Sequence, residues 1–318
     1  MVTGQTLQLS SRQTLRALEH IDLLDLLTTQ LLAGAPDASA SDASASDASV
    51  AGQHATAEQT VVDDTGTGQR CLLPTATLQL IRTTGLAALA ARTLAAPGVV
   101  TAAVFGSGAR LQLHVGAMAR YLPTLSHVAL SGPVADPLAP LDRSLLERVE
   151  EAGIGLSAAA TPRQAALGAN LFVVAGQDHP LDIGALPAGA LLVNSSGQDL
   201  PRPVVAGADR LYVDDLRLLP ASPQREFVRL HLAGEPAAPP SLLPHREGWY
   251  RPQPAGHGWP HVAADLADVL RGAAPGRTND DETLLAELLG TDVVDLELGR
   301  LLYRAAAAHG LGSWVDQL

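Results

Sequence analysis

The spacing of apolar residues divides the chain into a helical start, a polar interruption and a long alternating region. Leucine and isoleucine recur at helical spacing between Thr14 and Leu32, which predicts one amphipathic helix that ends before Gly34 and Pro36. The following segment repeats Asp, Ala and Ser and offers no large side chain for a core. We therefore expect residues 37–58 to form a low-complexity linker or surface loop that is mobile or irregular.

Beyond this linker, short apolar runs alternate with segments of helical spacing. A strand is expected at 61–66, leading into a turn, followed by an amphipathic helix over 77–95 that Pro97 and Gly98 end. From Val99 the alternation becomes regular. The expected strands are 99–105, 127–130, 154–158, 171–175, 191–195 and 211–213, and the expected helices are 111–121, 141–152, 162–167, 260–271, 280–289 and 292–308. Short apolar strands separated by helices predict an α/β fold with a parallel sheet of the Rossmann type.

One turn in the alternating region has the glycine spacing of a dinucleotide site. Gly106, Ser107 and Gly108 lie between the first strand of this region and its helix. The first glycine permits the tight turn, and the second lets a pyrophosphate approach the helix N-terminus. Two features depart from the usual pattern. Leu111 occupies the third glycine position, and Ser131 stands where an acid would bind the ribose, which favours NADP or weak binding.

Composition and charge exclude several classes of protein. The chain of 318 residues is 47% hydrophobic, which suits a globular protein, and it contains no apolar run long enough for a membrane span. The N-terminus lacks the pattern of a signal peptide, and Cys71 is the only cysteine, so we expect a cytoplasmic protein without disulfides. A net charge of −12 argues against nucleic acid as a partner.

The absence of lysine constrains the chemistry further. All 21 basic residues are arginine. Nucleotide bias explains this composition, since Ala, Gly, Pro and Arg are all abundant, but the chemical consequence holds in either case. Schiff-base catalysis through lysine and a lysine general base are both excluded.

Several motifs in colinear order resemble the ornithine cyclodeaminase/mu-crystallin family. They are LPTATLQLIRTT at 73–84, VFGSGA at 104–109, LYVD at 211–214, PGRTNDDE at 275–282, and Gly290, Asp295 and LYRA at 302–305. The resemblance covers about residues 60–318. It implies an NAD(P)-linked enzyme with a Rossmann domain at 96–279 and a smaller α+β domain for substrate binding and dimerisation. Both chain ends, 1–95 and 280–318, would form that smaller domain, and a homodimer is expected.

The resemblance also assigns roles to individual residues. Arg82 matches the arginine that clamps the substrate carboxylate, for which a planar fork is well shaped; the alternative is an ion pair on the helix surface. Asp214 matches the catalytic acid/base, although Asp215 could serve instead and a helix cap is the plain alternative. Thr84 matches a residue near the cofactor phosphates. The residues assigned to NAD or NADP are therefore Thr84, Gly106, Ser107, Gly108, Ala109 and Arg110.

The chain departs from the family at two places. The family has a catalytic lysine and a second arginine before its Asp-x-x-Thr-Gly turn, where this chain has the Ala/Ser/Asp linker. The family also has glutamine at the position of Arg110. Ornithine-type cyclodeamination, which uses that lysine, is therefore disfavoured.

Two hypotheses remain open from the sequence. The first is an NAD(P)-dependent oxidoreductase acting on an amino or imino acid, or on a carboxyl-bearing intermediate of specialised metabolism. The second is a degenerate relative that binds a small molecule, peptide or protein without redox chemistry. A metal site is not expected, because His245, His257 and His261 lie on a predicted loop at spacings that match no standard ligand set.

Overall fold

The computed structural model describes residues 5–34, 53–55, 58–64, 68–134, 136–176, 181–233, 260 and 262–316. The chain divides into two compact units: unit 1 comprises Met1–Gly85 and Asp292–Leu318, and unit 2 comprises Leu86–Thr291. The long helix α3 (Thr75–Leu94) contributes its first half to unit 1 and its second half to unit 2. The linker prediction for 37–58 and the three histidines at 245, 257 and 261 fall mostly or wholly outside the described residues.

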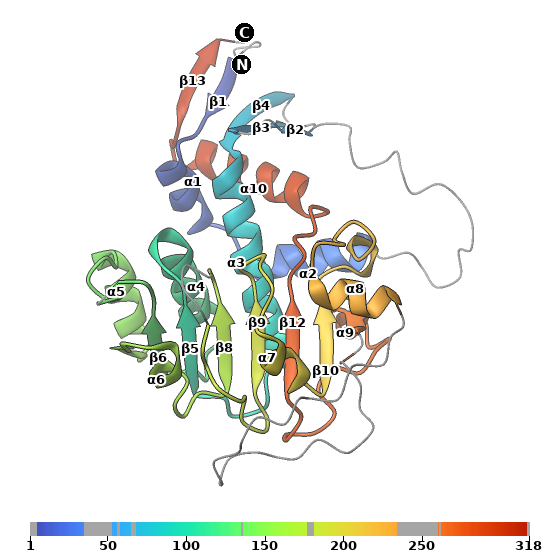
Figure 1. Ribbon diagram of the computed structural model, residues 1–318. Helices are drawn as coiled ribbons and strands as arrows, with labels where there is room; N and C mark the ends of the chain where they lie inside the picture. Colours follow the sequence, from blue (N-terminus) through green and yellow to red (C-terminus); the bar gives the residue numbers. More distant parts are fainter. Residues whose placement is uncertain are drawn as a thin grey trace. The chain divides into compact units, whose positions relative to one another are not determined.

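Unit 2 is built on an eight-stranded parallel sheet (Figure 1). Its strand order is β11-β10-β12-β9-β8-β5-β6-β7, and each neighbouring pair runs parallel. The strands are β5 (Thr101–Phe105), β6 (His127–Ser131), β7 (Gly155–Ala158), β8 (Leu171–Val174), β9 (Leu191–Asn194), β10 (Arg210–Val213), β11 (Val262–Asp265) and β12 (Leu284–Glu287). The central strands β8, β9 and β12 are buried at every position, as expected when both faces of a parallel sheet are covered.

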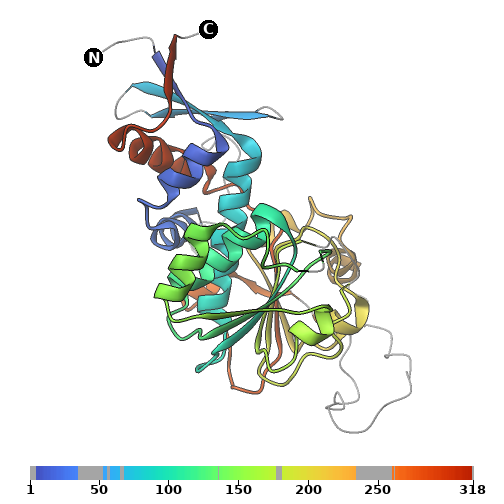
Figure 2. The same cartoon turned by 90° about the vertical axis from the view of Figure 1, so that its left-hand side faces the viewer.

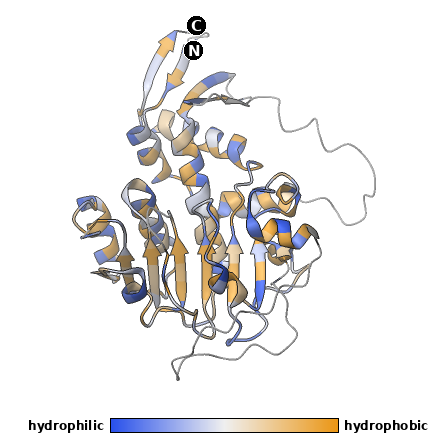
Figure 3. Ribbon diagram, viewed as in Figure 1, coloured by the Kyte–Doolittle hydropathy of each residue, from blue (hydrophilic) through white to orange (hydrophobic). Residues whose placement is uncertain are grey.

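Helices cover both faces of this sheet, as Figure 2 shows. Residues of α6, α7 and α8 share one buried cluster with the side chains that β5, β8, β9 and β10 direct to that face. Figure 3 shows the strands as the most hydrophobic part of the unit. The helices are α4 (Gly108–Tyr121), α5 (Arg143–Glu151), α6 (Pro162–Ala165), α7 (Arg202–Ala206), the 3₁₀ helix η1 (Leu216–Leu218), α8 (Glu226–Ala233) and α9 (Leu266–Leu270). The predicted Rossmann-type parallel sheet is confirmed.

Unit 1 is the smaller α+β unit. Its mixed sheet has the order β13-β1-β4-β3-β2, in which β1 and β4 are parallel and the other pairs antiparallel. The strands are β1 (Gln5–Gln8), β2 (Gln53–Ala55), β3 (Gln59–Asp64), β4 (Gln69–Pro74) and β13 (Ser313–Asp316), and the helices besides α3 are α1 (Ser11–Leu18), α2 (Leu23–Gly34) and α10 (Asp295–Ala308). Strands from both chain ends pair directly, so unit 1 is closed by the two termini.

The single helix predicted over 14–32 is wrong: α1 and α2 are separate. A capping box starts α1, in which the Ser10 backbone donates to the Gln13 side chain at 3.0 Å and Gln13 N donates back to Ser10 Oγ. Asp22 starts α2 by accepting from the backbone of Asp25 at 3.2 Å. The apolar spacing continues through the break, and periodicity alone therefore missed it.

Two of the three C-terminal helices were also wrong. Residues 260–271 form β11 and then α9, because Asp265 caps a new helix by accepting from Asp268 N at 2.9 Å. The predicted helix 280–289 contains β12, which lies between β9 and β10 in the sheet. This segment was assigned to the smaller domain, but its pairing places it in unit 2. The prediction also missed β1, β2, β4 and β13. No helix in the described part of the chain has the length and apolarity to cross a membrane.

Candidate functional site

The carboxyl ends of the parallel strands in unit 2 gather most of the candidate site residues along one sheet edge. From β5 the chain passes to β6 and β7 on one side and then crosses to β8 on the other. The strand order therefore reverses between β5 and β8. In open α/β sheets, ligands bind at this point, outside the carboxyl ends of the strands. The turn from β5 into α4, residues 106–108, lies there.

The turn is built from backbone in close contact. Gly106 has a φ of +147° and donates its N–H to the carbonyl of Ser131 at 3.1 Å. A Cβ on Gly106 would lie 3.1 Å from the backbone nitrogen of Gly176, and a Cβ on Gly132 would lie 2.4 Å from the carbonyl oxygen of Gly106. These glycines therefore allow the backbone segments after β5, β6 and β8 to pack in direct contact.

The amino end of α4 is open to solvent. Gly108, Ala109 and Arg110 are all exposed in the first turn of this 14-residue helix. Gly108 has a φ of +57°, and a Cβ there would meet nothing within 4 Å. The first N–H groups of a helix have no partner within it and carry the positive end of its dipole. The structure thus brings Gly106, Ser107, Gly108, Ala109 and Arg110 together in one turn, and cofactor binding by this turn stays a prediction.

Ser131, at the end of β6, supplies a second feature of this edge. Its side chain is 0% exposed, and its Oγ has no hydrogen-bond partner among the described residues. A buried hydroxyl without a partner is costly, so an unpaired one near a ligand turn is a candidate contact. Ser131 therefore stands where the usual acid is absent, with a hydroxyl free to donate or accept.

A buried histidine ties α4 to the end of β9. His114 Nδ1 lies 2.7 Å from the carbonyl oxygen of Arg110, and Nε2 lies 2.9 Å from Ser195 Oγ. Because a carbonyl can only accept, Nδ1 carries the ring hydrogen, and the hydroxyl hydrogen of Ser195 is shared between Nε2 and the Val174 carbonyl. Burial lowers the pKa of His114 to about 4, although the hydrogen bond to Arg110 opposes the shift. The imidazole is therefore neutral at physiological pH.

Asp214 follows β10 at the same edge, but backbone donors fill its carboxylate. Oδ1 accepts from Leu289 N at 2.7 Å, and Oδ2 accepts from Gly290 N and Thr291 N, both at 2.8 Å. The side chain is 1% exposed, and burial raises its pKa despite these three bonds. This geometry fixes the loop after β12. These bonds give Asp214 a structural role, and its acid/base role stays a prediction.

Asp215 is also engaged. It caps η1 by accepting from Arg217 N at 2.9 Å, pairs with the Arg217 guanidinium at 2.8 Å, and accepts from Thr291 Oγ1 at 3.1 Å. Burial raises the pKa of Asp215, but the hydrogen bonds and charge of Arg217 outweigh it, and the net shift is downward. Asp215 is therefore held as a carboxylate.

A buried cluster on β9 and β12 was not foreseen. Glu287 Oε2 accepts from Asn194 Nδ2 at 2.9 Å and pairs with the Arg225 guanidinium, which also reaches Asp199 at 3.1 Å. Burial raises the pKa of Glu287 to about 7, with Arg225 and Asn194 opposing the shift. Glu287 is thus the carboxyl at this edge whose pKa lies near neutrality. Its position was hidden because 280–289 was predicted to be helical.

Arg82 lies in unit 1, in the middle of α3, and forms a buried ion pair. Its Nη1 donates to Asp295 Oδ2, at the start of α10, at 2.5 Å. Arg82 is 8% exposed and Asp295 6% exposed, so the pair is not the surface contact considered from the sequence. Among the described residues, Arg82 Nε and Asp295 Oδ1 have no partner. Burial raises the pKa of Asp295, against the attraction of Arg82.

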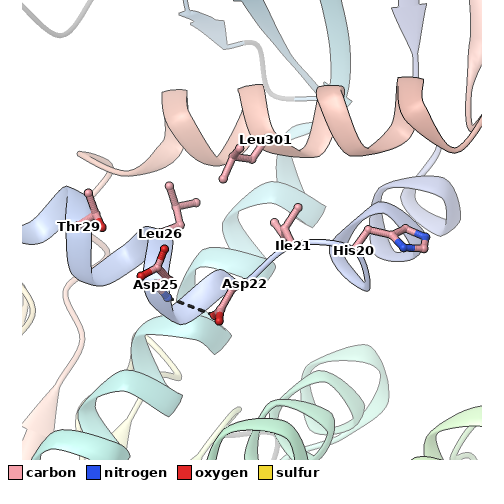
Figure 4. Close-up of a pocket in the computed structure, with 7 residues that line it drawn as sticks. All are labelled: His20, Ile21, Asp22, Asp25, Leu26, Thr29 and Leu301. Atoms are coloured by element: carbon pink, nitrogen blue, oxygen red, sulfur yellow. Dashed lines mark hydrogen bonds between the residues drawn. The ribbon is translucent and has the colours of Figure 1, made fainter.

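Thr84 lies two residues further along α3 in unit 1. It is buried, and its Oγ1 has no hydrogen-bond partner among the described residues. Its contact with cofactor phosphates stays a prediction. Unit 1 also carries a pocket of about 330 Å³ between α2 and α10 (Figure 4). The pocket is lined by His20, Ile21, Asp22, Asp25, Leu26, Thr29 and Leu301, which include no predicted site residue.

Comparison with known proteins gives a consistent picture, although no family model matches the chain. The curated protein "Uncharacterized cyclodeaminase y4tK" of Sinorhizobium fredii is 27% identical over 259 residues, covering 78% of this chain and 69% of that protein. A lysine cyclodeaminase structure, described for recognition of L-lysine, L-ornithine and L-2,4-diaminobutyric acid, has a TM-score of 0.63 at 18% identity, covering 99% of this chain and 96% of that one.

A second solved structure extends the comparison. The Δ¹-pyrroline-2-carboxylate reductase of Thermococcus litoralis, in complex with NADH and L-proline, has a TM-score of 0.58 at 17% identity, covering 81% of this chain and 74% of that one. These structures share the fold described above. Together with the colinear motifs and the related cyclodeaminase sequence, they agree with the resemblance of the chain to the ornithine cyclodeaminase/mu-crystallin family.

Proposed function

We propose that this protein is an NAD(P)-dependent oxidoreductase that acts on an amino or imino acid, or on a related carboxyl-bearing intermediate. The observation that carries the proposal is the exposed amino end of α4 above a backbone-lined glycine turn, at the point where the strand order reverses. The reductase that binds NADH and L-proline and the lysine cyclodeaminase support the same class of reaction.

The turn fits a dinucleotide by three criteria. A Cβ at Gly108 would meet nothing within 4 Å, so the space beside this residue is open for a pyrophosphate to approach the backbone. The exposed first turn of α4 offers N–H donors, and Arg110 adds a positive charge there. The buried Ser131 hydroxyl replaces the acid that would select the ribose of NAD. A bound nicotinamide would supply the hydride, and the choice between NAD and NADP stays open.

Arg82 is proposed to bind the substrate carboxylate. In a guanidinium, Nε–H and the nearer Nη2–H lie along one edge and form the fork that holds a carboxylate bidentately. Asp295 engages Nη1, at the other end of the group. No described residue accepts from Nε or Nη2, so the fork itself is unoccupied by protein. The ion pair therefore orients Arg82 without blocking its predicted role.

One observation favours the second hypothesis, a family member that binds a ligand without redox chemistry. The predicted acid/base, Asp214, already accepts three backbone N–H groups, and Asp215 is paired with Arg217. A proton donor for amine formation would then have to come from another group, and burial raises the pKa of Glu287 to about 7, although its carboxyl group is buried and paired with Arg225. A protein that lacks such a donor would bind the cofactor or substrate without turnover.

Cofactor titrations followed by fluorescence distinguish an oxidoreductase from a protein that binds a ligand without redox chemistry. The purified protein is titrated with NADH and with NADPH, and Δ¹-pyrroline-2-carboxylate is then added while NAD(P)H absorbance is followed. Saturable binding with reduction of this or another cyclic imino acid supports the oxidoreductase. Binding without turnover across a panel of imino acids supports the second hypothesis. Absence of binding by either cofactor at millimolar concentration would refute the oxidoreductase.

The expected cytoplasmic homodimer and a place in specialised metabolism belong to the same proposal. Family analogy supports the dimer, with unit 1 as the proposed substrate and dimerisation domain. Light scattering of the purified chain tests it, because a dimer has twice the mass of the 32.9 kDa chain.

A further inference from the structure

The buried Arg82–Asp295 pair leaves one donor and one acceptor unused. Asp295 Oδ2 accepts a hydrogen bond from Arg82 Nη1 at 2.5 Å. Arg82 Nε and Asp295 Oδ1 are both buried and have no hydrogen-bond partner among the described residues. Most ion pairs at this depth satisfy such atoms, because an unpaired buried polar atom costs free energy. Two unpaired atoms of opposite character in one pair point to a ligand that supplies both complements.

The complement to this pair is a carboxylate joined to a protonated nitrogen. A carboxylate would accept from the Nε/Nη2 fork of Arg82, and an N–H of an ammonium or iminium group would donate to Asp295 Oδ1. The local charge agrees, because Asp292 adds a second negative charge that raises the pKa of Asp295. A cationic nitrogen beside Asp295 is therefore favoured by this charge.

We propose that Asp295 is a specificity-determining residue, which receives the charged nitrogen of an α-amino or α-imino acid while it holds Arg82 in position. This inference rests on the proposed function, since it requires that Arg82 binds the substrate carboxylate. It adds a requirement that Arg82 alone does not impose: simple carboxylates bind more weakly than carboxylates with an adjacent cationic nitrogen. The proposed ligand class is therefore zwitterionic.

Three probes with matched alkyl chains test this requirement. L-Norvaline carries both groups, pentanoate lacks the ammonium group, and butylamine lacks the carboxylate. Binding of each is measured by calorimetry, with and without a saturating reduced cofactor. We expect norvaline to bind about ten-fold more tightly than pentanoate, the worth of one hydrogen bond to a charged group, and butylamine to bind more weakly than norvaline.

The key variant is Asp295→Asn. Its amide oxygen can still accept from Arg82 Nη1, whereas its NH₂ group replaces the acceptor at Oδ1. We expect the preference for norvaline over pentanoate to disappear and pentanoate to bind at least as tightly as before. The matched control is Asp64→Asn, another buried aspartate of unit 1 that pairs with arginine, Arg304, at 2.6 Å. This control should keep the preference, and thermal unfolding checks that both variants fold.

The outcomes separate this inference from the proposed function. If wild-type protein binds pentanoate and norvaline equally, or if Asp295→Asn keeps the preference, Asp295 does not receive the nitrogen and the inference is wrong. If no probe binds, or if Arg82→Lys leaves pentanoate affinity unchanged, Arg82 does not bind carboxylates and the proposed substrate site fails as well. Asp295→Glu gives a second check, because it keeps the charge but moves it by one methylene and should also reduce the preference.

Discussion

Asp295, the first residue of α10, holds Arg82 of α3 through a contact of 2.5 Å between Oδ2 and Nη1. The two residues lie 213 positions apart in the chain, yet both belong to unit 1. The pair therefore links the two chain segments that form this unit, in addition to orienting the guanidinium. Removing one partner would leave the other charge buried without compensation.

The first prediction concerns stability. Asp295→Ala should destabilise the protein by about 3–5 kcal/mol, the usual cost of leaving one member of a buried pair unpaired. A double variant, Arg82→Met with Asp295→Leu, should recover most of that loss, since neither charge remains. Denaturant unfolding measures both. Equal destabilisation by the single and double variants would show that the pair is not coupled in this way.

The second prediction concerns the carboxylate fork. Arg82→Lys should keep a positive charge but weaken pentanoate and norvaline binding by about ten-fold or more, because an ammonium cannot form the bidentate contact. Calorimetry with the probes described above measures the effect. Arg304→Lys serves as the control, since Arg304 pairs with Asp64 elsewhere in unit 1. Unchanged affinity in Arg82→Lys would remove the argument for a carboxylate clamp.

The third prediction separates the structural from the catalytic role of Asp214. Its two oxygens accept three backbone N–H groups, whereas asparagine has one acceptor oxygen and would present an NH₂ group to at least one donor. Asp214→Asn should cost about 1–3 kcal/mol for each donor left unsatisfied. Unfolding of this variant and of Asp215→Asn is compared. Normal stability with complete loss of turnover in Asp214→Asn would instead support the acid/base role.

The fourth prediction uses two opposing titrations. Burial lowers the pKa of His114 to about 4 from 6.5, so the stability it contributes is complete above pH 6.5 and is lost as the pH falls towards 4. Burial raises the pKa of Glu287 to about 7 from 4.5, so its contribution is complete below pH 4.5 and is lost as the pH rises towards 7. Where these two pH ranges overlap, His114 and Glu287 change the free energy of unfolding in opposite directions.

A variant of either residue should therefore reveal the pH dependence of stability that the other residue contributes. In His114→Gln, stability should fall as the pH rises through the acidic range, with a slope of up to about 1.4 kcal/mol per pH unit. In Glu287→Gln, stability should rise with pH over the same range. Denaturant unfolding at a series of pH values measures both. Variants with parallel pH profiles would show that these groups do not titrate as their burial implies.

Much of unit 2 was predictable from sequence, because its strands are short apolar runs separated by helices. Two of its strands, β11 and β12, were predicted to be helical. β12 is buried at all four positions, and a short apolar run of this kind cannot be distinguished from a helical segment by periodicity. Unit 1 was harder to predict. Its strands β1 and β13 each have four residues, and they pair with segments at the other end of the chain. Such pairing leaves no local signal.

The candidate site was also predictable only in part from the sequence. Local spacing located the turn at Gly106–Gly108, since a glycine motif between a strand and a helix is a local pattern. The partners of Arg82 and Asp214 were not predictable, because Asp295 and the loop 289–291 are distant in sequence. The resemblance assigned their roles to single residues. Only the folded structure shows that the Asp214 carboxylate accepts three backbone N–H groups. It also shows that Nε of Arg82 has no hydrogen-bond partner among the described residues.

The most direct test of the central claim is cofactor binding by Gly108→Asn. Asparagine tolerates a positive φ, so the variant should fold, but its side chain would project into the open space above α4, where the pyrophosphate is proposed to bind. The matched control is Gly153→Asn, which replaces another exposed glycine of unit 2 with a φ of +73° and open space around its Cβ. NADH and NADPH are titrated against all three proteins by fluorescence.

The account predicts saturable binding of at least one cofactor by the wild-type protein and by Gly153→Asn. In Gly108→Asn, affinity should fall at least about ten-fold, the equivalent of losing one or more charge-assisted hydrogen bonds to phosphate. Equal affinity in all three proteins would place the cofactor elsewhere. No binding by the wild-type protein would contradict the dinucleotide site itself.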